Sequence, residues 1–156
     1  MERKNQVKSF RESIGYQIDK TAVYLKVYGS QFFNSKNFGI TLEQFIALVA
    51  LFESDNICQR DLSKLILKDR SNTSRILNIL EEKGLIQRII DTKQKRLVKK
   101  VSLTDKGREL LFKIGPEIKQ SYESLIEGIS EEEIEILRKI LEKLRNNLSE
   151  YTTIQI

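Results

Sequence analysis

The feature that most constrains the fold of this sequence is a change of hydrophobic pattern within residues 57–107. Leu62, Leu65 and Ile66 lie three and four residues apart, which is typical of the apolar face of a short helix. The period breaks at LKDRSN and restarts with residues at i, i+3, i+4 and i+7, namely Thr73, Ile76, Leu77 and Leu80. This pattern predicts two short helices joined by a tight corner.

The second of these helices has an opposite face with six small hydrogen-bonding or guanidinium side chains and no acid among them. Asp69 is expected to cap its N-terminus, and Gly84 ends it where a residue that tolerates positive φ is needed. Arginine can make bidentate contacts with guanine and asparagine with adenine, while serine fits a phosphate or a base edge. We therefore expect this face to enter a DNA major groove. Its side chains are Arg70, Ser71, Asn72, Ser74, Arg75 and Asn78.

Two strands with a basic turn are expected after the second helix. Residues 85–90 are rich in β-branched and apolar side chains, and residues 97–103 partly alternate, as half-buried strands do. Positions 92–104 contain no acid and five basic residues, which are Lys93, Lys95, Arg96, Lys99 and Lys100. The pattern predicts a hairpin with a cationic tip, that is, a wing.

This central stretch resembles the MarR family of winged helix-turn-helix transcriptional regulators. The resemblance rests on SNTSRILNILEEKGLIQR at 71–88, on the basic wing and on VSLTDKG at 101–107. Two positions depart from the family pattern. Gln94 stands where the wing usually has an Asp before its Arg, and Cys58 stands where a Thr or Ser often caps the first short helix.

The remaining chain is expected to be helical. Residues 7–33 have mostly helical spacing and predict one long helix, and the helix that Thr41 opens is apolar nearly all round and should be buried. A third helix is expected to begin at Thr104 and to have a kink at Pro116. The last helix is expected to begin with a capping box at Ser130. That last helix has an apolar stripe suited to a partner helix, formed by Ile134, Leu137, Leu141, Leu144 and Leu148.

We therefore predict a mainly α fold with a small β-hairpin wing, in one unit over residues 1–156. Residues 38–104 would form the winged helix-turn-helix lobe, and residues 7–34 and 105–150 a helical dimerisation region. The resemblance implies that the first and last helices of two subunits interlock. A two-fold dimer would read a pseudo-palindrome with its two reading helices about one DNA turn, ~34 Å, apart.

Charge and composition favour a nucleic-acid partner over an enzyme. Positions 57–106 hold 13 Lys and Arg against 6 Asp and Glu, while the whole chain of 156 residues has a net charge of only +5. A basic surface that is merely solvated is the alternative. The chain has no His, no glycine-rich phosphate loop and no nucleophile beside a recognisable base, so we predict no enzyme activity, no cofactor and no metal site.

The expected location is the cytoplasm. One cysteine excludes an internal disulfide and suits a reducing compartment. No apolar run approaches the roughly 18 residues that a membrane span needs, and MERKNQVKSF lacks the apolar segment of a signal peptide.

The sequence thus predicts a dimeric, sequence-specific double-stranded-DNA-binding transcriptional regulator, a repressor released by a small-molecule effector. A winged helix that binds only proteins is the alternative. Ser71, Asn72, Ser74 and Arg75 should reach base edges, and Arg70 and Lys68 should hold phosphates. Lys93, Lys95 and Arg96 of the wing should lie in or over the minor groove. For Arg75 a surface ion pair is the alternative, and Thr73 should pack inward.

The resemblance also implies regulation by a small, often aromatic ligand or by cysteine oxidation. A pocket would lie between the first, second and fifth helices, with Tyr16, Tyr24 and Phe45 as candidates; plain core packing is the alternative for these aromatic residues. Cys58 could be oxidised, although a buried inert thiol is the commoner situation.

Overall fold

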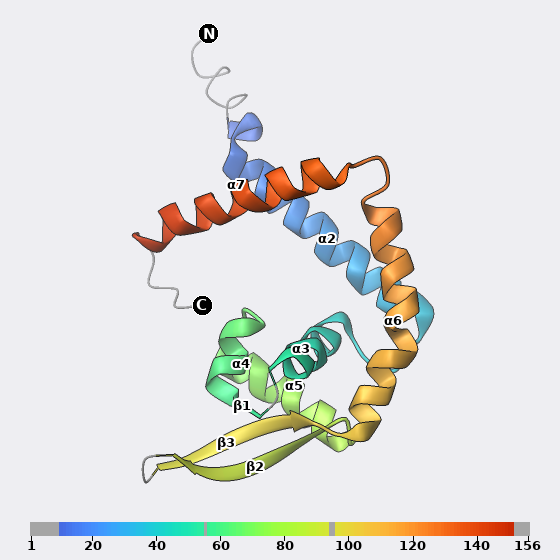
Figure 1. Cartoon of the computed structure of the whole chain (residues 1–156), viewed down its shortest axis with the longest axis vertical. Coiled ribbons are helices and arrows are strands. Elements are labelled where there is room, and N and C mark those ends of the chain that lie inside the picture. Colours follow the sequence, from blue (N-terminus) through green and yellow to red (C-terminus); the bar gives the residue numbers. More distant parts are fainter. Residues whose placement is uncertain (1–9, 55, 94–95, 152–156) are drawn as a thin grey trace. The chain divides into compact units, whose positions relative to one another are not determined.

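The computed structural model describes residues 10–54, 56–93 and 96–151, with the backbone alone at 91–93 and 96–99 (Figure 1). The chain divides into two compact units, Met1–Phe45 and Ile46–Ile156. In the described ranges, no helix is both long enough and apolar enough to span a membrane.

Most of the first unit is helix α2, Ile14–Lys36. Residues 10–12 are also helical, but Ser13 interrupts the helix with φ −63° and ψ 143°, and its hydroxyl oxygen accepts a hydrogen bond from the Tyr16 amide at 3.3 Å. The expectation of one helix over residues 7–33 is therefore wrong at its beginning, because a serine hydroxyl satisfies the helix N-terminus there. Asn37, in the left-handed conformation with φ 51°, ends α2.

An aromatic cluster closes the first unit. The ring of Phe33, which is 4% exposed, lies 5.3 Å from the Phe38 ring and 5.2 Å from the Phe45 ring. Phe32 joins it, with its ring 6.0 Å from that of Phe33. Such tilted and edge-on pairs are the favoured aromatic geometries. The cluster fixes the loop between α2 and the next helix.

Helix α3, Leu42–Glu53, begins with a reciprocal cap. The Gln44 amide donates to the Thr41 hydroxyl at 3.2 Å, and the Thr41 amide donates to the Gln44 side-chain oxygen at 3.2 Å. Burial is one-sided: Ala47, Leu48 and Leu51 are buried, whereas Ile46 and Phe52 are 42% and 45% exposed. The prediction that this helix is buried is therefore wrong, in the single chain, for the face that carries Ile46 and Phe52.

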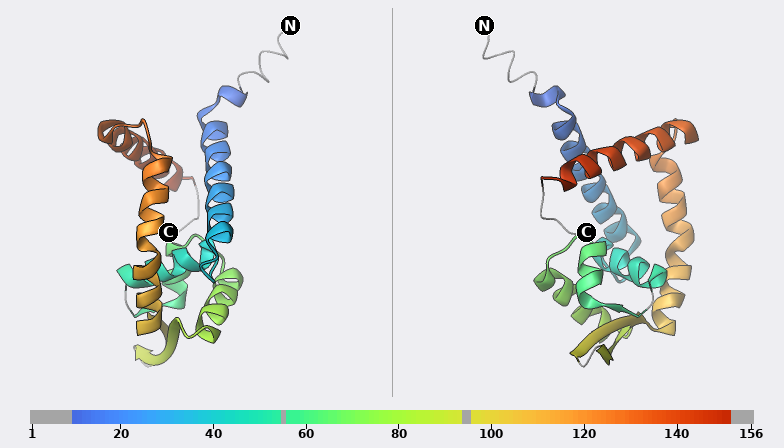
Figure 2. Two further views of the ribbon diagram at one scale, coloured as in Figure 1. Left: turned by 90° about the vertical axis from the view of Figure 1, so that its right-hand side faces the viewer. Right: turned by 60° about the vertical axis from the view of Figure 1, so that its left-hand side comes forward.

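The second unit contains a three-stranded antiparallel sheet in the order β1-β3-β2. Strand β1 is Ile57–Cys58, β2 is Ile86–Lys93 and β3 is Arg96–Leu103. Strand β2 pairs with β3 from Ile86 opposite Leu103 to Lys93 opposite Arg96, and Ile57 of β1 lies opposite Val101. The hairpin of β2 and β3 is the predicted wing; its tip extends beyond the short helices in Figure 1, and the hairpin lies below them in both views of Figure 2. Strand β1 was not predicted.

Helices α4, Gln59–Leu65, and α5, Arg70–Glu82, pack against this sheet. Their buried side chains join those of β3 and of α6, Asp105–Leu125. The fully buried apolar residues of the second unit include Leu62, Leu77, Leu80, Val101 and Ile114. Leu65, expected on the apolar face of α4, is instead 50% exposed, since the helix ends there and the chain turns away.

The start of α6 fits tightly against the end of α5. The Thr104 hydroxyl accepts from the Gly107 amide at 3.1 Å and donates to the Gly84 carbonyl oxygen at 2.7 Å. Gly107 lies so close to the Leu85 carbonyl oxygen that a side chain there would overlap it. Farther along, α6 continues as one helix through Pro116.

Helix α7, Glu131–Ser149, has the predicted capping box. The Glu133 amide donates to the Ser130 hydroxyl at 3.2 Å, and the Ser130 amide donates to the Glu133 carboxylate at 2.9 Å. These contacts with Ser130 hold the pKa of the Glu133 carboxyl below its usual value. No residue of α7 is buried. In the single chain, Leu137 and Leu148 of its apolar stripe are exposed, and Ile134, Leu141 and Leu144 are half-buried.

Candidate nucleic-acid interface

The corner between α4 and α5 is held by the backbone. Leu67 adopts the left-handed conformation with φ 54°, and the Lys68 amide donates to the Ser63 carbonyl oxygen at 3.0 Å. Cys58 precedes α4 without capping it through its side chain; its thiol donates instead to the Asp61 carboxylate at 2.9 Å. The helix-turn-helix predicted from the periodicity is present.

Asp69 caps α5, as predicted. Its carboxylate accepts from the Asn72 amide at 2.8 Å and from the Asn72 side-chain nitrogen at 2.5 Å. The hydrogen bond from the Asn72 backbone, followed by that from its side chain, holds the pKa of Asp69 below the ordinary value of 3.8.

The two faces of α5 differ as the sequence predicts. Thr73, Ile76, Leu77 and Leu80 are buried, and the Thr73 hydroxyl donates to the Asp69 carbonyl oxygen at 2.8 Å, which confirms its inward orientation. On the other side, Ser74 is half-buried, and the other five side chains predicted to face the groove are exposed, namely Arg70, Ser71, Asn72, Arg75 and Asn78. Burial of one stripe orients the remaining polar side chains outward together.

Arg75 contacts a neighbour on its own helix. Its guanidinium donates to the Asn72 side-chain oxygen at 3.3 Å. The alternative left open by the sequence, an ion pair with a nearby acid, does not form among the residues that the structure describes. Most of the guanidinium donors of Arg75 therefore face solvent.

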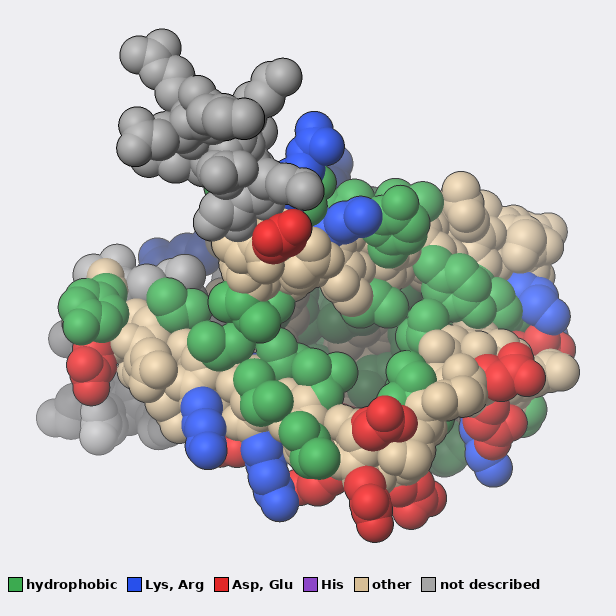
Figure 3. Space-filling model, turned by 90° about the horizontal axis from the view of Figure 1, so that it is seen from above, with side chains coloured by type: hydrophobic (Ala, Val, Ile, Leu, Met, Phe, Trp, Pro, Cys, Tyr) green, Lys and Arg blue, Asp and Glu red, His purple; other side chains and the backbone are tan. Residues whose placement is uncertain are grey.

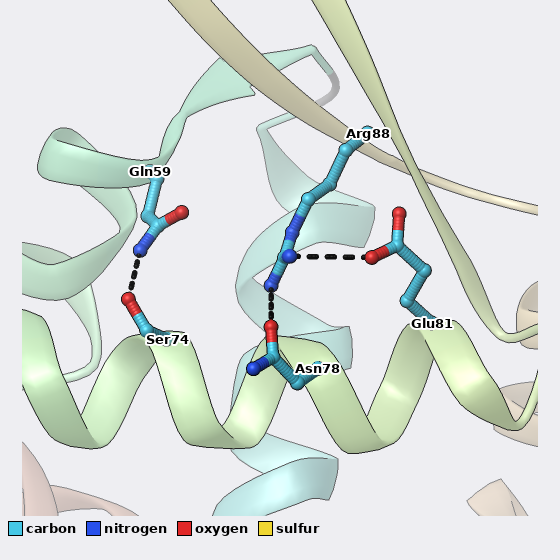
Figure 4. A network of polar contacts seen from close by, with 5 residues as sticks. All are labelled: Gln59, Ser74, Asn78, Glu81 and Arg88. Atoms are coloured by element: carbon cyan, nitrogen blue, oxygen red, sulfur yellow. Dashed lines mark hydrogen bonds and ion pairs between the residues drawn. The ribbon is translucent and has the colours of Figure 1, made fainter.

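Two residues outside α5 hold its polar side chains (Figure 4). The Gln59 amide, at the start of α4, donates to the Ser74 hydroxyl at 2.6 Å. Arg88 of β2 donates to the Asn78 side-chain oxygen at 2.7 Å and pairs with Glu81 at 3.2 Å. Sequence reasoning missed both residues, because their partners lie 15 and 10 positions away and no period links them. For Arg88, the sequence signal was a charge within LIQRII, where Gln87 is the one other polar residue.

The predicted phosphate and wing contacts are only partly described. Lys68 lies half-buried at the corner before α5. In the wing, Lys93 and Arg96 are paired across β2 and β3 by their backbones. Their side chains, and the whole of Lys95, lie outside the described residues. The roles of these three wing residues stay predictions.

The three candidate pocket residues have separate neighbours. The Tyr16 ring lies 5.5 Å from the Phe10 ring, and the Phe45 ring lies 5.2 Å from that of Phe33. Tyr24 is 68% exposed. Within the described ranges, no ring contact joins the three residues, and no group of three His, Cys, Asp or Glu is placed to hold a metal ion. The effector pocket stays a prediction.

The Asp69 cap leads to a prediction about pH. Because the pKa of Asp69 is lower in the folded chain than in the unfolded one, its contribution to stability is present above pH 3.8 and is lost as the pH falls through the folded pKa. Thermal unfolding midpoints between pH 6 and pH 2 should therefore fall more for wild type than for Asp69→Asn, which keeps a capping oxygen without the charge. An NMR titration showing Asp69 at an ordinary pKa would contradict this.

Comparisons with known proteins agree with this arrangement. The sequence pattern of the MarR family matches residues 40–98. The chain is 31% identical over 113 residues, which are 72% of this chain and 75% of the other, to the uncharacterized HTH-type transcriptional regulator YybA of Bacillus subtilis.

Solved structures are similar over nearly the whole chain. The structure of Staphylococcus aureus MepR in a DNA complex has a TM-score of 0.72 at 28% identity, covering 87% of this chain and 96% of that one. The transcriptional regulator SlyA has a TM-score of 0.74 at 32% identity, covering 88% of this chain and 95% of that one. The chain therefore belongs to the MarR family of helix-turn-helix transcriptional regulators, a family of regulators and not of enzymes.

Proposed function

We propose that this regulator is a dimeric, cytoplasmic repressor that binds a pseudo-palindromic DNA duplex through α5. The observation that carries the proposal is the exposed polar face of residues 70–78 of α5, which has no acid and lies opposite the buried apolar stripe. The similarity to MepR, solved in complex with DNA, supports it. In this proposal Ser71, Asn72, Ser74 and Arg75 reach base edges. Arg70 and Lys68 hold phosphates, and the wing residues Lys93, Lys95 and Arg96 lie in or over the minor groove.

Arg75→Ala is expected to lower the affinity for the preferred duplex by about 1–3 kcal/mol and to relax sequence preference, because arginine reads guanine with two donors. Lys95→Ala should instead weaken binding to all sequences alike and reduce the salt dependence, since it removes a positive charge from the wing, whose attraction to DNA does not depend on the sequence. The measurement is a gel-shift titration at several salt concentrations on preferred and scrambled duplexes. Equal losses on every sequence for both variants would contradict this division of roles, and wild-type protein that binds no duplex at low salt would refute the proposed function.

Dimerisation through α7 is supported by the exposed apolar side chains of this helix. Ile136, Leu137, Ile140 and Leu148 are 57%, 55%, 46% and 57% exposed. Hydrophobic side chains also lie at the surface, beside acidic and basic ones, in the view of Figure 3. Contiguous exposed apolar surface of this kind marks an interaction site.

Replacing both Leu137 and Leu148 by Arg should shift the protein from dimer to monomer in sedimentation experiments, because two charges would be buried between helices. Asn146→Arg is the matched control: it adds the same side chain to the polar side of α7 and should leave the dimer intact. Unchanged sedimentation of the double variant would contradict the assignment of this surface.

Release by an effector completes the proposal. A small aromatic ligand could change DNA affinity only by binding more tightly to one spacing of the two reading helices than to the other. Tyr16, Tyr24 and Phe45 are the candidate contacts.

A further inference from the structure

Asn78 of α5 has its two amide ends in different environments. Its side-chain oxygen faces Arg88, whose Nη2 donates to it at 2.7 Å. A guanidinium has donors and no acceptor, so the amide must turn its oxygen toward Arg88. Among the described residues the side-chain nitrogen of Asn78 has no partner, and the residue is exposed. Ser71 and Arg75 lie on the same face, at helical spacing from Asn78.

Arg88 is held more firmly than an ordinary surface arginine. It stands on β2, its side chain is 23% exposed, and its Nη1 pairs with Glu81 at 3.2 Å. Glu81 and Asn78 are both on α5, so the planar guanidinium bridges two successive turns of that helix (Figure 4). A planar fork with two fixed partners has little freedom to rotate away. The Asn78 oxygen is therefore held facing Arg88, which uses one of its two lone pairs, and the amide nitrogen is turned away from Arg88.

This fixed orientation changes what Asn78 can recognise, because the nitrogen is the end of the amide that is left for a ligand. Asparagine selects adenine by accepting from the N6 amino group and donating to N7 at the same time, which needs the oxygen and the nitrogen together. We propose that Arg88 is a positioning residue that makes Asn78 a donor-only reader, directed to an acceptor atom on the duplex and unable to select adenine. The acceptor is guanine O6 or N7, thymine O4 or a phosphate oxygen. This inference rests on the proposed DNA binding of α5.

The first test uses the full-length chain and a duplex that it selects from a random pool. Each adenine of the half-site is replaced in turn by purine, which lacks the 6-amino group, and binding is measured for wild type and for Asn78→Ala. Asn78→Ala should lower affinity about 3- to 10-fold, as expected for one hydrogen bond. The effect of each adenine replacement should be the same in both proteins within about twofold.

Two results would overturn the inference. A fivefold or larger coupling between Asn78 and one adenine amino group would show that the amide accepts from the base. No loss of affinity in Asn78→Ala would show that it donates nothing to the duplex. Asn78 is exposed, so this variant is expected to fold. The selected sequences then separate the two kinds of acceptor: a preference lost at one base pair indicates a base, and a uniform loss indicates a phosphate.

The second test concerns Arg88 itself, by repeating the selection with variants. Arg88→Met frees the Asn78 oxygen, so adenine should become accepted at the base pair nearest Asn78. Arg88→Lys still donates to that oxygen and should retain the wild-type preference. Glu81→Gln, which keeps an acceptor for Nη1 and does not touch Asn78, is the matched control and should also select the wild-type sequence.

A merely structural role of Arg88 would give a different outcome. Arg88→Met would then bind every duplex more weakly and still select the wild-type sequence, which would overturn the positioning role. Circular dichroism and thermal unfolding establish whether Arg88→Met is folded. The test with purine duplexes does not depend on this variant, because it uses only wild type and Asn78→Ala. Wild-type protein that binds no duplex refutes the proposed function, whereas binding with adenine coupling to Asn78 refutes this inference alone.

Discussion

Gly107→Ala is expected to lower the free energy of unfolding by about 2–3 kcal/mol. A methyl group at this position would overlap the Leu85 carbonyl oxygen and lie 3.2 Å from a methyl carbon of Leu103. The carbonyl belongs to backbone between α5 and β2, so it cannot move aside without shifting the hairpin. Urea unfolding at a fixed protein concentration measures the loss, because association makes apparent stability depend on concentration.

Gly115→Ala is the matched control, in the same helix. Nothing lies within 4 Å of the position that its new carbon would occupy. The helix preference of Ala over Gly would favour the variant by about 0.5–1 kcal/mol, but Pro116 crowds a preceding residue that has a side chain. Because these two contributions oppose each other, we expect the free energy of unfolding of Gly115→Ala to lie within about 0.5 kcal/mol of the wild-type value. A Gly107→Ala variant as stable as this control would contradict the close approach at α6.

Leu77→Ala is expected to destabilise the second unit by about 2–5 kcal/mol. Leu77 is fully buried on the inner face of α5. Alanine retains a high helix propensity, so the loss would come from the cavity and from reduced apolar burial, not from the helix itself. Urea unfolding monitored by circular dichroism measures the change.

The control for this substitution is Leu65→Ala in the neighbouring helix α4. Leu65 is 50% exposed, so the same chemical change should cost less than about 1 kcal/mol. Similar losses for Leu65→Ala and Leu77→Ala would mean that the burial of α5 described here is wrong. If Leu77→Ala also weakens binding to all duplexes alike, the core and the reading face are coupled through the position of α5.

Local patterns predicted those features that depend on neighbours in the sequence. The stripe of Thr73, Ile76, Leu77 and Leu80 predicted α5, and Asp69 and Gly84 predicted its ends, because periodicity, capping and positive φ are local properties. The hairpin followed from β-branched residues on both sides of a polar turn. The capping box at Ser130 is equally local.

Features that depend on distant partners were missed. Strand β1 has two residues, which are too few to show an alternating pattern. It forms because Ile57 pairs with Val101 of β3, which lies far away in the sequence. Likewise, the link between Arg88 and Asn78 joins a strand to a helix, and no spacing in the sequence implies it. Ser13 was passed over because its apolar neighbours continue the helical period on both sides, although its hydroxyl begins a new helix.

The left-handed backbone at Leu67 has a consequence for the orientation of the reading helix. A leucine does not favour a positive φ. The Leu67 side chain is 67% exposed, so its own packing does little to offset the cost of this conformation. The packing of α4 and α5 on either side holds Leu67 in this conformation. A substitution that weakens the packing of α4 or α5 would therefore allow Leu67 to return to a negative φ. The orientation of α5 would then change although the chain remains folded.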